Sequence, residues 1–470
     1  MPEFDLAVIG AGAAGLSVTA VAAQLGLRVA LIERHRMGGD CLNTGCVPSK
    51  ALLAAAHAAQ DIAAARRFGI RATPLIDWAA VRAHVHGVIA GIAPMDSAAR
   101  FTAIGAEVIA GEARFTAPDT LAIGPRRLTA RRIVIAAGGR AALPGIPGLA
   151  ACDPLTHETL FDLPDLPPHL LILGGGPVGL EMAQAFAGLG SQVTLVEAAR
   201  IAGKEDPELA DGLRATLRQN GVTLIEGIAV TAAEPGPALL LADGRRIAGS
   251  HLLVAAGRRP NLENLGLEAG NIRATAAGIA TDAGLRSLTN RRVYAMGDIA
   301  DPAGIGPRAF THVGSYHAGI VIRRALFRLP ARLDYAALPR VTYTAPELAQ
   351  VGLTEAEARA AGHAIRILRW PIADNDRAQA ERRPEGLVKL IVTPRGRVLG
   401  IGILAPHAGD MLGAWTLAIA RRIPLSAMAG MIVPYPTLSE APKRAASSFF
   451  APRLFAEGTK WLVRQLSRLP

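Results

Sequence analysis

Cysteine is scarce in this sequence, with only three residues in 470. So few thiols cannot build a structural disulfide framework, whereas one oxidisable pair with a thiol left over is compatible with a reducing cytosol. Cys41 and Cys46 lie close together, and Cys152, which stands apart, is interpreted as structural. The cysteine content predicts a cytoplasmic protein whose thiol chemistry is confined to one pair.

The sequence also lacks an unbroken apolar stretch of about twenty residues, the length that a membrane span requires. The Ala-rich segment 51–65 is interrupted by His57, Gln60 and Asp61. No basic region or cleavage site of a signal peptide is expected, because residues 4–9 already have the composition of a buried strand. These absences again predict a cytoplasmic protein.

Long runs of like charge are missing as well. Lysine and arginine outnumber aspartate and glutamate by 50 to 39, and the formal net charge of +11 comes mostly from scattered arginines. An arm that binds nucleic acid normally shows a block of about five or six like charges. We therefore predict no nucleic-acid partner and interpret the charge as general basicity, which also attracts small anionic partners.

What the sequence does contain is a duplicated pattern, in a chain long enough for roughly three domains. In each copy a buried strand leads into a glycine-rich turn, a helix follows, and a second strand ends in glutamate. The turn glycines are Gly10, Gly12 and Gly15 in the first copy and Gly174, Gly176 and Gly179 in the second, and the glutamates are Glu33 and Glu197. A single G-x-G-x-x-G is weak evidence, but two such units predict two Rossmann-type dinucleotide sites.

The residue types of each copy suit a dinucleotide. Glycines let the backbone turn tightly and approach a pyrophosphate, and the helix N-terminus supplies amide donors and positive potential. Glu33 and Glu197 are then expected to accept hydrogen bonds from the hydroxyls of an adenosine ribose. The alternative for each is a solvated position at the end of a strand.

Cys41 and Cys46 lie in residues 38–50, a glycine-rich loop that enters a helix closely behind the first fingerprint. This spacing at a helix start brings the two sulfurs near one another, where the helix dipole and Lys50 stabilise one of them as thiolate. Two unrelated buried cysteines are the alternative, which the scarcity of cysteine elsewhere disfavours. The pair is interpreted as redox-active.

This run resembles the redox motif of the FAD-dependent pyridine nucleotide–disulfide oxidoreductases, the family of dihydrolipoamide dehydrogenase, glutathione reductase and mercuric reductase. Further segments follow the family order from residue 4 to about residue 450. The resemblance implies an enzyme with an α/β fold, in which two Rossmann-type dinucleotide-binding domains precede a C-terminal α+β dimerisation domain. It also implies a homodimer in which each chain completes the active site of the other.

The resemblance indicates the domain boundaries, and proline and glycine are found where the chain passes from one domain to the next. The expected units are a discontinuous FAD domain of residues 1–150 and 266–332, an NAD(P) domain of residues 151–265, a dimerisation domain of residues 333–450 and a helical tail of residues 451–470. Segments 133–139 and 253–261 look like the strands that close each nucleotide unit.

FAD is assigned to the first copy, because that fingerprint leads directly into the cysteine helix and the active pair must face the flavin. Further expected FAD contacts are Gly39, Lys50, Gly138, Asp298, Thr311 and His312, and Gly257 is expected at the NAD(P) site. Asp298 looks like the residue that holds the ribityl chain, whereas His312 is equally compatible with a packed or capping histidine. At the second copy Glu197 favours a ribose 2′-hydroxyl and hence NADH, while Arg200 and Lys204 keep NADPH open.

The resemblance also implies roles in catalysis. Cys46 faces the flavin and Cys41 is the interchange thiol that attacks a disulfide or ligates a soft metal. Lys50 and Glu181 match the family's ion pair beside the flavin, where a cation stabilises the reduced ring, and two separate surface charges are the alternative.

One segment departs from the majority pattern of the family. Residues 433–440 carry Tyr435 where the lipoamide and glutathione enzymes have a catalytic histidine, and tyrosine is a poor base at neutral pH. Glu440 is then expected to accept from the Tyr435 hydroxyl or to act as a weak base itself. Mercuric reductases share this tyrosine, but they deliver metal with a C-terminal cysteine pair that residues 464–470 do not contain.

The predicted substrate is therefore a small sulfur compound or a soft metal ion, which thiolates bind directly, with no resident metal in the protein. Two alternatives stay open. One is NAD-dependent dihydrolipoamide dehydrogenase activity, and the other is a diaphorase that reduces quinones and uses the cysteines only as an electron reservoir.

The tail of residues 453–468 combines a helical apolar pattern with positive charge. Its apolar members are Leu454, Phe455, Trp461, Leu462 and Leu466, and its basic members are Arg453, Lys460, Arg464 and Arg468. Such a helix suits an anionic membrane surface, through residues 452–470, or packing against the dimer. Packing against the dimer is the favoured interpretation.

Overall fold

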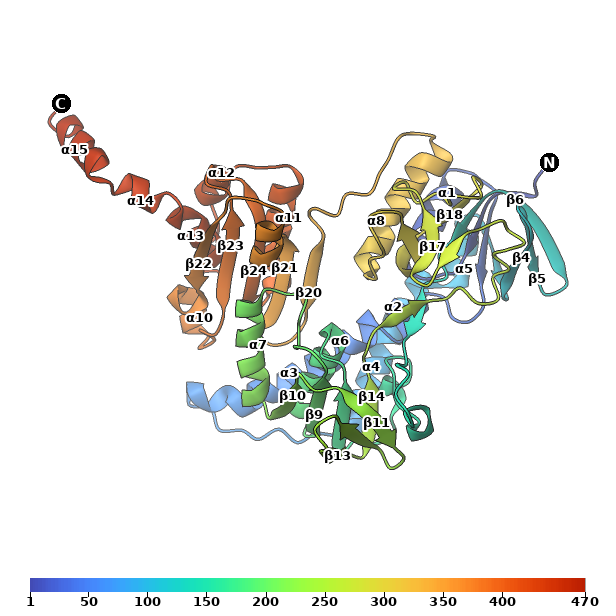
Figure 1. Ribbon diagram of the computed structural model, residues 1–470, viewed down its shortest axis with the longest axis horizontal. Helices are drawn as coiled ribbons and strands as arrows, with labels where there is room; N and C mark the ends of the chain where they lie inside the picture. Colours follow the sequence, from blue (N-terminus) through green and yellow to red (C-terminus); the bar gives the residue numbers. More distant parts are fainter. Residues whose placement is uncertain (470) are drawn as a thin grey trace.

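The computed structural model describes residues 1–469, which form three bodies and a projecting C-terminal tail (Figure 1). The N-terminal body and the C-terminal body lie at opposite ends of the long axis, and the middle of the chain forms the body below them. Each body has its own buried hydrophobic cluster.

The first body is built on a seven-stranded sheet with the order β3-β2-β1-β6-β5-β4, in which β18 pairs with β6. The strands are β1 Phe4–Ile9, β2 Val29–Glu33, β3 Ala106–Ala110, β4 Ala113–Ala117, β5 Thr120–Ile123, β6 Arg126–Ile135 and β18 Val293–Ala295. Pairing is parallel among β3, β2, β1, β6 and β18 and antiparallel between β6, β5 and β4. Helices α1 (Ala13–Gln24) and α8 (Thr311–Val321) pack against each other beside this sheet.

The second body repeats the first copy with four parallel strands in the order β10-β9-β8-β14. They are β8 His169–Leu173, β9 Gln192–Glu197, β10 Val222–Glu226 and β14 His251–Val254, with helices α6 Pro177–Gly188 and α7 Pro207–Gln219 and a small antiparallel sheet of β11 Val230–Glu234, β12 Ala238–Leu241 and β13 Arg246–Ala248. Leucines fill the strands on both faces, as expected of a parallel sheet covered by helices.

A long helix ties the redox loop to the second body. Helix α3 (Cys46–Ala64) follows the short α2 (Gly39–Asn43) and packs against α6 and α4 (Trp78–Ile92). Its apolar side chains, including Leu52 and Leu53, belong to the same buried cluster as the core of α6. The cysteines at its start therefore lie where the first two bodies meet.

Two short crossing strands join those bodies. Strand β7 (Gly139–Ala141) leaves the first sheet and pairs antiparallel with β15 (Arg258–Pro260), which returns from the second. Both crossings fall in segments that the sequence marks with small residues.

The third body is a five-stranded antiparallel sheet with the order β20-β21-β24-β23-β22. Its elements are β20 Pro339–Thr342, β21 Glu347–Gly352, β22 Arg366–Pro371, β23 Leu387–Val392, β24 Val398–Ala405, α9 Glu355–Ala360, α10 Asp376–Ala380, α11 Ala408–Ala420, α12 Leu425–Gly430 and α13 Glu440–Ser448. The mixed α/β architecture confirms the predicted fold class, with two Rossmann-type units and a separate α+β unit.

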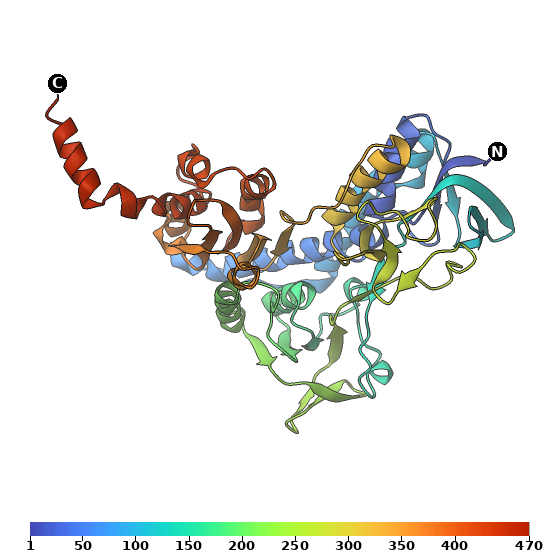
Figure 2. The same cartoon turned by 45° about the horizontal axis from the view of Figure 1, so that its top comes forward.

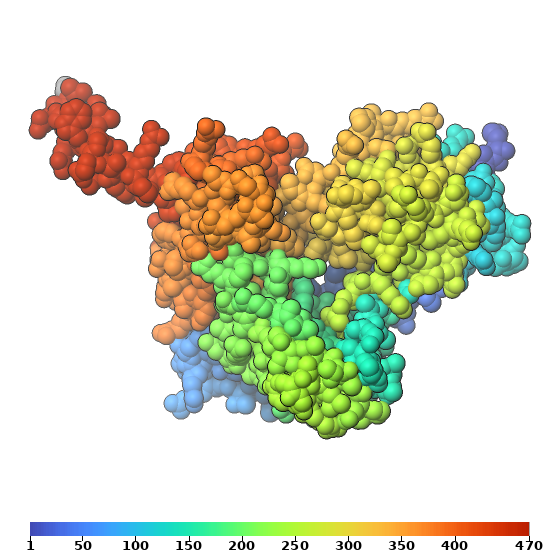
Figure 3. Space-filling model, in the orientation of Figure 1, coloured from blue at the N-terminus to red at the C-terminus, as the bar shows by residue number. Residues whose placement is uncertain are grey.

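The tail stands clear of the three bodies in both ribbon views and in the space-filling view (Figures 2 and 3). It consists of α14 (Ala451–Leu454) and α15 (Glu457–Leu466), so the expected single helix is broken after Leu454. Its large apolar side chains, Trp461 and Leu462 among them, are exposed. Within residues 1–469, no helix is both long and apolar enough to cross a membrane.

Candidate active site

One cleft brings together the two glycine fingerprints and the cysteine pair. Its volume is about 3040 Å³, against about 300–1,000 Å³ for an ordinary small-molecule pocket. The predicted site residues that line it are Gly10, Gly12, Glu33, Gly39, Cys41, Cys46, Lys50, Gly138, Gly174, Gly176, Glu181, Glu197, Gly257, Asp298, Thr311 and His312. The cleft has room for more than one extended ligand.

The two fingerprints have matching backbone geometry. Gly10 and Gly174 have φ of +100° and +116°, and a Cβ on either would meet a backbone carbonyl oxygen at 2.4 or 2.5 Å. A Cβ on Gly15 or Gly179 would meet the carbonyl oxygen of the first glycine at 1.9 or 2.0 Å, so these glycines serve close packing of helix on strand and lie behind the cleft wall. Both turns therefore form the cradle that a dinucleotide pyrophosphate requires.

The two strand-end glutamates are held in the same way. Glu33 accepts from the backbone N–H of Ala11 at 2.7 Å and from that of His35 at 2.8 Å. Glu197 accepts from the backbone N–H of Gly175 at 2.7 Å and from that of Ala199 at 2.9 Å. Each carboxylate is thus fixed beside its glycine turn, and both residues line the cleft.

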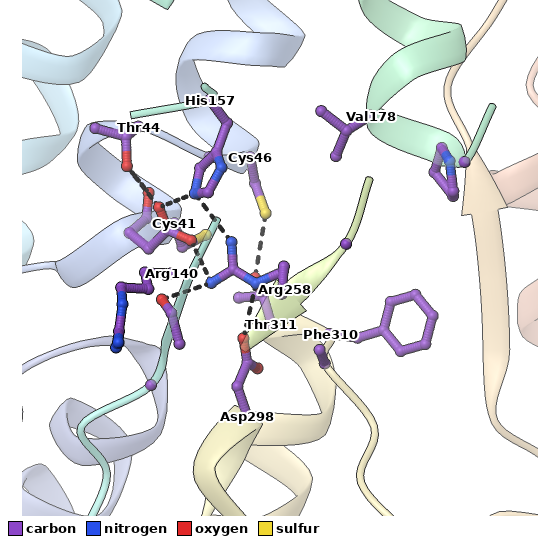
Figure 4. Close-up of a pocket in the computed structure, with 18 of the residues that line it drawn as sticks. Cys41, Thr44, Cys46, Arg140, His157, Val178, Arg258, Asp298, Phe310 and Thr311 are labelled. Carbon is purple, nitrogen blue, oxygen red and sulfur yellow. Dashed lines mark hydrogen bonds and ion pairs between the residues drawn. The ribbon is translucent and has the colours of Figure 1, made fainter. Parts of the chain in front are cut away.

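The two cysteines lie on consecutive short elements. Cys41 is in α2, Cys46 is the first residue of α3, and both thiols are free (Figure 4). The sulfur of Cys46 is 3.1 Å from Oγ1 of Thr311, the first residue of α8. A thiolate at Cys46 therefore faces the N-terminal ends of two helices, where the helix dipoles are positive.

The surroundings give the two thiols different charges. The pKa of Cys46 is lowered to about 6, chiefly by the hydrogen bond from the Cys41 thiol, with Thr311 and Lys50 acting in the same direction and burial opposing them. The same hydrogen bond, followed by burial, raises the pKa of Cys41 far above its ordinary value. At neutral pH the reduced pair therefore consists of a thiolate at Cys46 and a thiol at Cys41.

Lys50 and Glu181 form an ion pair, with Nζ 2.7 Å from Oε2, although 131 positions separate them. The Glu181 side chain is only 5% exposed, and breaking an ion pair at so buried a position is strongly destabilising. Tyr343, from the third body, adds two contacts. Its backbone N–H donates to Glu181 Oε1 at 3.0 Å, and its ring centroid lies 4.4 Å from the Lys50 ammonium.

Two further predicted FAD contacts, Asp298 and His312, also have protein partners. Asp298 accepts from Arg258 Nε at 3.2 Å, and burial raises the pKa of this carboxyl even beside the guanidinium. His312 contacts the carbonyl oxygen of Pro339 at 3.1 Å through Nε2, and its ring stacks on Phe310. Burial lowers the pKa of His312, which favours the packed, neutral alternative for this residue.

Tyr435 and Glu440 do not line the cleft of their own chain, and the expected hydrogen bond between them is wrong. The Tyr435 hydroxyl donates to Asp376 Oδ2 at 2.9 Å, which raises the pKa of the tyrosine. Asn375 Nδ2 holds α10 in place by donating at 3.0 Å to the backbone carbonyl two residues after Tyr435. Glu440 lies 3.7 Å from Arg444 on its own helix.

Sequence reasoning missed several residues that the fold brings to the site or to the tyrosine: Asp40, His157, Arg258, Tyr343 and Asp376. Asp40 is the direct neighbour of Cys41, which was a usable signal, and Arg258 follows Gly257 in a segment already singled out. The others reach their positions from distant parts of the chain, so nothing in their local sequence marks them.

Comparison with known proteins gives a consistent result. The model of the pyridine nucleotide-disulphide oxidoreductases matches residues 4–326, and the model of the dimerisation domain of those enzymes matches residues 338–446. A mercuric reductase of Streptomyces lividans is 38% identical, over 95% of this chain and 96% of the relative. A dihydrolipoyl dehydrogenase of Thermus scotoductus is 34% identical, over 95% and 98%.

Solved structures agree with this fold. The Cu(II) complex of a HOCl-induced flavoprotein disulfide reductase from Escherichia coli superposes with a TM-score of 0.84 at 27% sequence identity. The match covers 95% of this chain and 99% of that one.

Proposed function

We propose that this chain, which belongs to the pyridine nucleotide-disulphide oxidoreductase family of FAD-dependent enzymes, uses NAD(P)H and the Cys41–Cys46 pair to reduce a sulfur or soft-metal substrate. The observation that carries the proposal is the pairing of a thiolate at Cys46 with a thiol at Cys41 in the cleft that also holds both dinucleotide fingerprints. Such a pair can store two electrons as a dithiol and release them on forming a disulfide.

The residues of the cleft fit both cofactors. The turn at Gly10 and Gly12 with Glu33 suits the adenine half of FAD, and the N-terminus of α8 at Thr311 suits its flavin end. The turn at Gly174 and Gly176 suits NAD(P)H in the same way. When bound, FAD supplies two-electron exchange between a nicotinamide and sulfur.

Cys41 is the residue that we assign to the substrate. Its sulfur attacks one sulfur of a substrate disulfide as the Cys41 proton passes to the leaving sulfur, so that a mixed disulfide forms and the first substrate thiol leaves. The Cys46 thiolate then attacks the Cys41 sulfur, releases the second substrate thiolate and leaves the Cys41–Cys46 disulfide. For a soft metal ion the two sulfurs act as ligands instead.

Lys50 and Glu181 are assigned to the nicotinamide side of the site. The buried carboxylate fixes the ammonium of Lys50 in the cysteine helix, and the Tyr343 ring lies against the ammonium. A cation held in this position stabilises negative charge on a reduced cofactor without moving during the reaction.

The substrate class rests on Tyr435. Its hydroxyl is tied to Asp376, and this hydrogen bond raises the pKa of Tyr435, so the side chain stays protonated at neutral pH and cannot take a proton from a dithiol. A metal ion bound by thiolates needs no such base. We therefore favour a mercuric-reductase-like reaction over dihydrolipoamide oxidation, in a homodimer where Tyr435 of one chain reaches the cleft of its partner.

For the nicotinamide cofactor we propose a preference for NADH. Glu197 is fixed by two backbone donors at the ribose end of the second fingerprint, and Arg200, which also lines the cleft, is paired with Asp211 at 2.7 Å. Steady-state kinetics should give the larger kcat/KM with NADH. A tenfold advantage for NADPH would contradict the assignment.

The thiol proposal is tested with the Cys41→Ser variant of the holoenzyme, assayed with NADH against lipoamide, glutathione disulfide, Hg(II) and a quinone. Thiol chemistry predicts that the variant loses turnover with the sulfur or metal substrate that wild type accepts. If the wild-type enzyme turns over only the quinone and the variant retains that activity, the protein is a diaphorase. The Cys152→Ser variant is the matched control, because Cys152 does not line the cleft.

A further inference from the structure

A charged side chain stands directly beside the redox pair. Asp40 precedes Cys41 in α2, and both oxygens of its carboxylate have protein partners. Oδ2 lies 2.7 Å from Arg258 Nη2, while Oδ1 accepts from the Thr44 hydroxyl at 2.5 Å and lies 3.1 Å from His157 Nε2. The carboxylate therefore has one cationic partner in a fixed position.

Arg258 reaches Asp40 from the strand that joins the two nucleotide-binding bodies. It is the first residue of β15, and Nη2 also donates to the backbone carbonyl of Gly139 in the facing strand β7 at 2.9 Å. Nε contacts Asp298 at 3.2 Å, and Nη1 lies 3.0 Å from His157. The guanidinium is only 28% exposed, so solvent screens it incompletely.

Both members of this pair stay charged. Burial alone would raise the pKa of Asp40, but His157 and Arg258 hold it well below its usual range. The negative charge of Asp40 raises the pKa of Cys41 and of Cys46, against the lowering effects of Thr311 and Lys50. Arg258 is the cation that pairs with this carboxylate, at 2.7 Å.

We propose that the Asp40–Arg258 ion pair sets the reduction potential of the Cys41–Cys46 pair, with Asp40 disfavouring the thiolate and Arg258 balancing it. Both are positioning residues that act through the field at the sulfurs. The inference rests on the proposed function only in taking these cysteines as the redox pair.

The sign of each effect follows from which form carries the charge. Only the reduced pair has a thiolate, so a change that stabilises the thiolate favours reduction and makes the pair more oxidising. Asp40→Asn removes a negative charge beside the sulfurs while Arg258 keeps its contact with Asp298, so the change stabilises the thiolate. Arg258→Met leaves Asp40 uncompensated and has the opposite effect.

The test uses purified holoenzyme equilibrated anaerobically with glutathione buffers, followed by labelling of free thiols. The reaction balances, because reduced pair plus glutathione disulfide gives the Cys41–Cys46 disulfide plus two glutathiones. We expect Asp40→Asn to shift the equilibrium constant about tenfold toward the reduced pair, which is about 30 mV for this two-electron couple. Arg258→Met should shift it about tenfold toward the disulfide, and the double variant should return close to wild type.

Arg140→Met is the matched control. Arg140 lies in β7, the strand that pairs with β15, and its ion-pair partner is Glu263 rather than Asp40. The substitution should therefore leave the equilibrium constant unchanged. If the equilibrium constant shifts in the same direction in both single variants, or does not shift, the proposal is overturned. Structural damage to the loop would not change sign with the sign of the charge removed. The measurement reads the cysteines directly, so failure here is distinct from failure of Cys41→Ser to abolish turnover.

Discussion

Cys46 and Cys41 differ in charge because each occupies a different position in one hydrogen bond. Cys46 accepts a hydrogen bond from the Cys41 thiol, and this bond, Thr311 and the positive charge of Lys50 all lower its pKa. Cys41 lies beside the resulting thiolate, which raises the pKa of Cys41. The difference makes Cys46 the thiol that is ionised in the reduced protein at physiological pH.

A pH titration of thiol reactivity tests this assignment. In the reduced Cys152→Ser protein, alkylation of Cys46 by iodoacetamide should rise with pH around a midpoint near 6, because the lowered pKa of about 6 keeps the thiolate populated until the pH falls through that value. Thr311→Val removes one stabilising hydrogen bond and should raise the midpoint. A midpoint near the ordinary thiol value of 9.0 would contradict the assignment.

The ion pair of Lys50 and Glu181 gives a second prediction at this scale. Lys50→Ala leaves a nearly buried carboxylate without its cation, so we expect the rate of flavin reduction by NADH to fall roughly tenfold to a hundredfold. Stopped-flow absorbance under anaerobic conditions measures this rate. Tyr343→Phe, which keeps both the ring and the backbone N–H, is the control, and traces of Lys50→Ala that match wild type would remove the assigned role.

Single residues were predictable from the sequence where a motif carries them. The fingerprint glycines and the cysteines belong to local patterns whose spacing reflects one turn or one helix start. The Lys50–Glu181 contact spans two bodies, and only resemblance to a family pointed to it. Asp376 displaced Glu440 as the partner of Tyr435 because the packing of α10 against the Tyr435 loop is a tertiary contact with no local signature.

At the scale of elements, hydrophobic runs and glycine turns located the strands well. The strand predicted at residues 4–9 coincides with β1, and the strand predicted to end at Glu33 coincides with β2. The tail was less predictable. Its helical periodicity continues through residues 455–456, but the chain breaks there into α14 and α15.

The tail helix α15 has one apolar side and one basic side. Trp461, Leu462 and Leu466 lie on the apolar arc, and Lys460 and Arg464 lie opposite. The tail directly follows the segment that matches the dimerisation domain, so we favour packing against the second chain of a homodimer.

Deleting residues 452–470 tests that interpretation. The truncated protein should dissociate at higher concentration than the full chain in analytical ultracentrifugation, because the apolar arc no longer contributes to the dimer. Neither protein should sediment with anionic liposomes. Sedimentation of the full chain, lost on truncation, would instead establish the membrane-surface alternative.

At the scale of the whole molecule, the arrangement of the bodies places the dithiol between two dinucleotide cradles. The duplication and the cysteine motif predicted that both cofactors and the redox pair belong to one enzyme, and the family relationship confirms the class. The sequence did not reveal that α3 packs its length on the second body, or that the crossing strand β15 carries Arg258 back to the redox loop. Both depend on how separate bodies meet, which no local pattern encodes.

The most direct test of the account is an anaerobic titration of the purified yellow protein with NADH. If Cys46 is the thiolate that faces the flavin, two-electron reduction should produce a long-wavelength thiolate-to-flavin absorbance band, and a sulfur or soft-metal substrate should discharge it. Bleaching of the flavin without that band, with recovery on adding quinone alone, would contradict the central claim that electrons pass through Cys41 and Cys46.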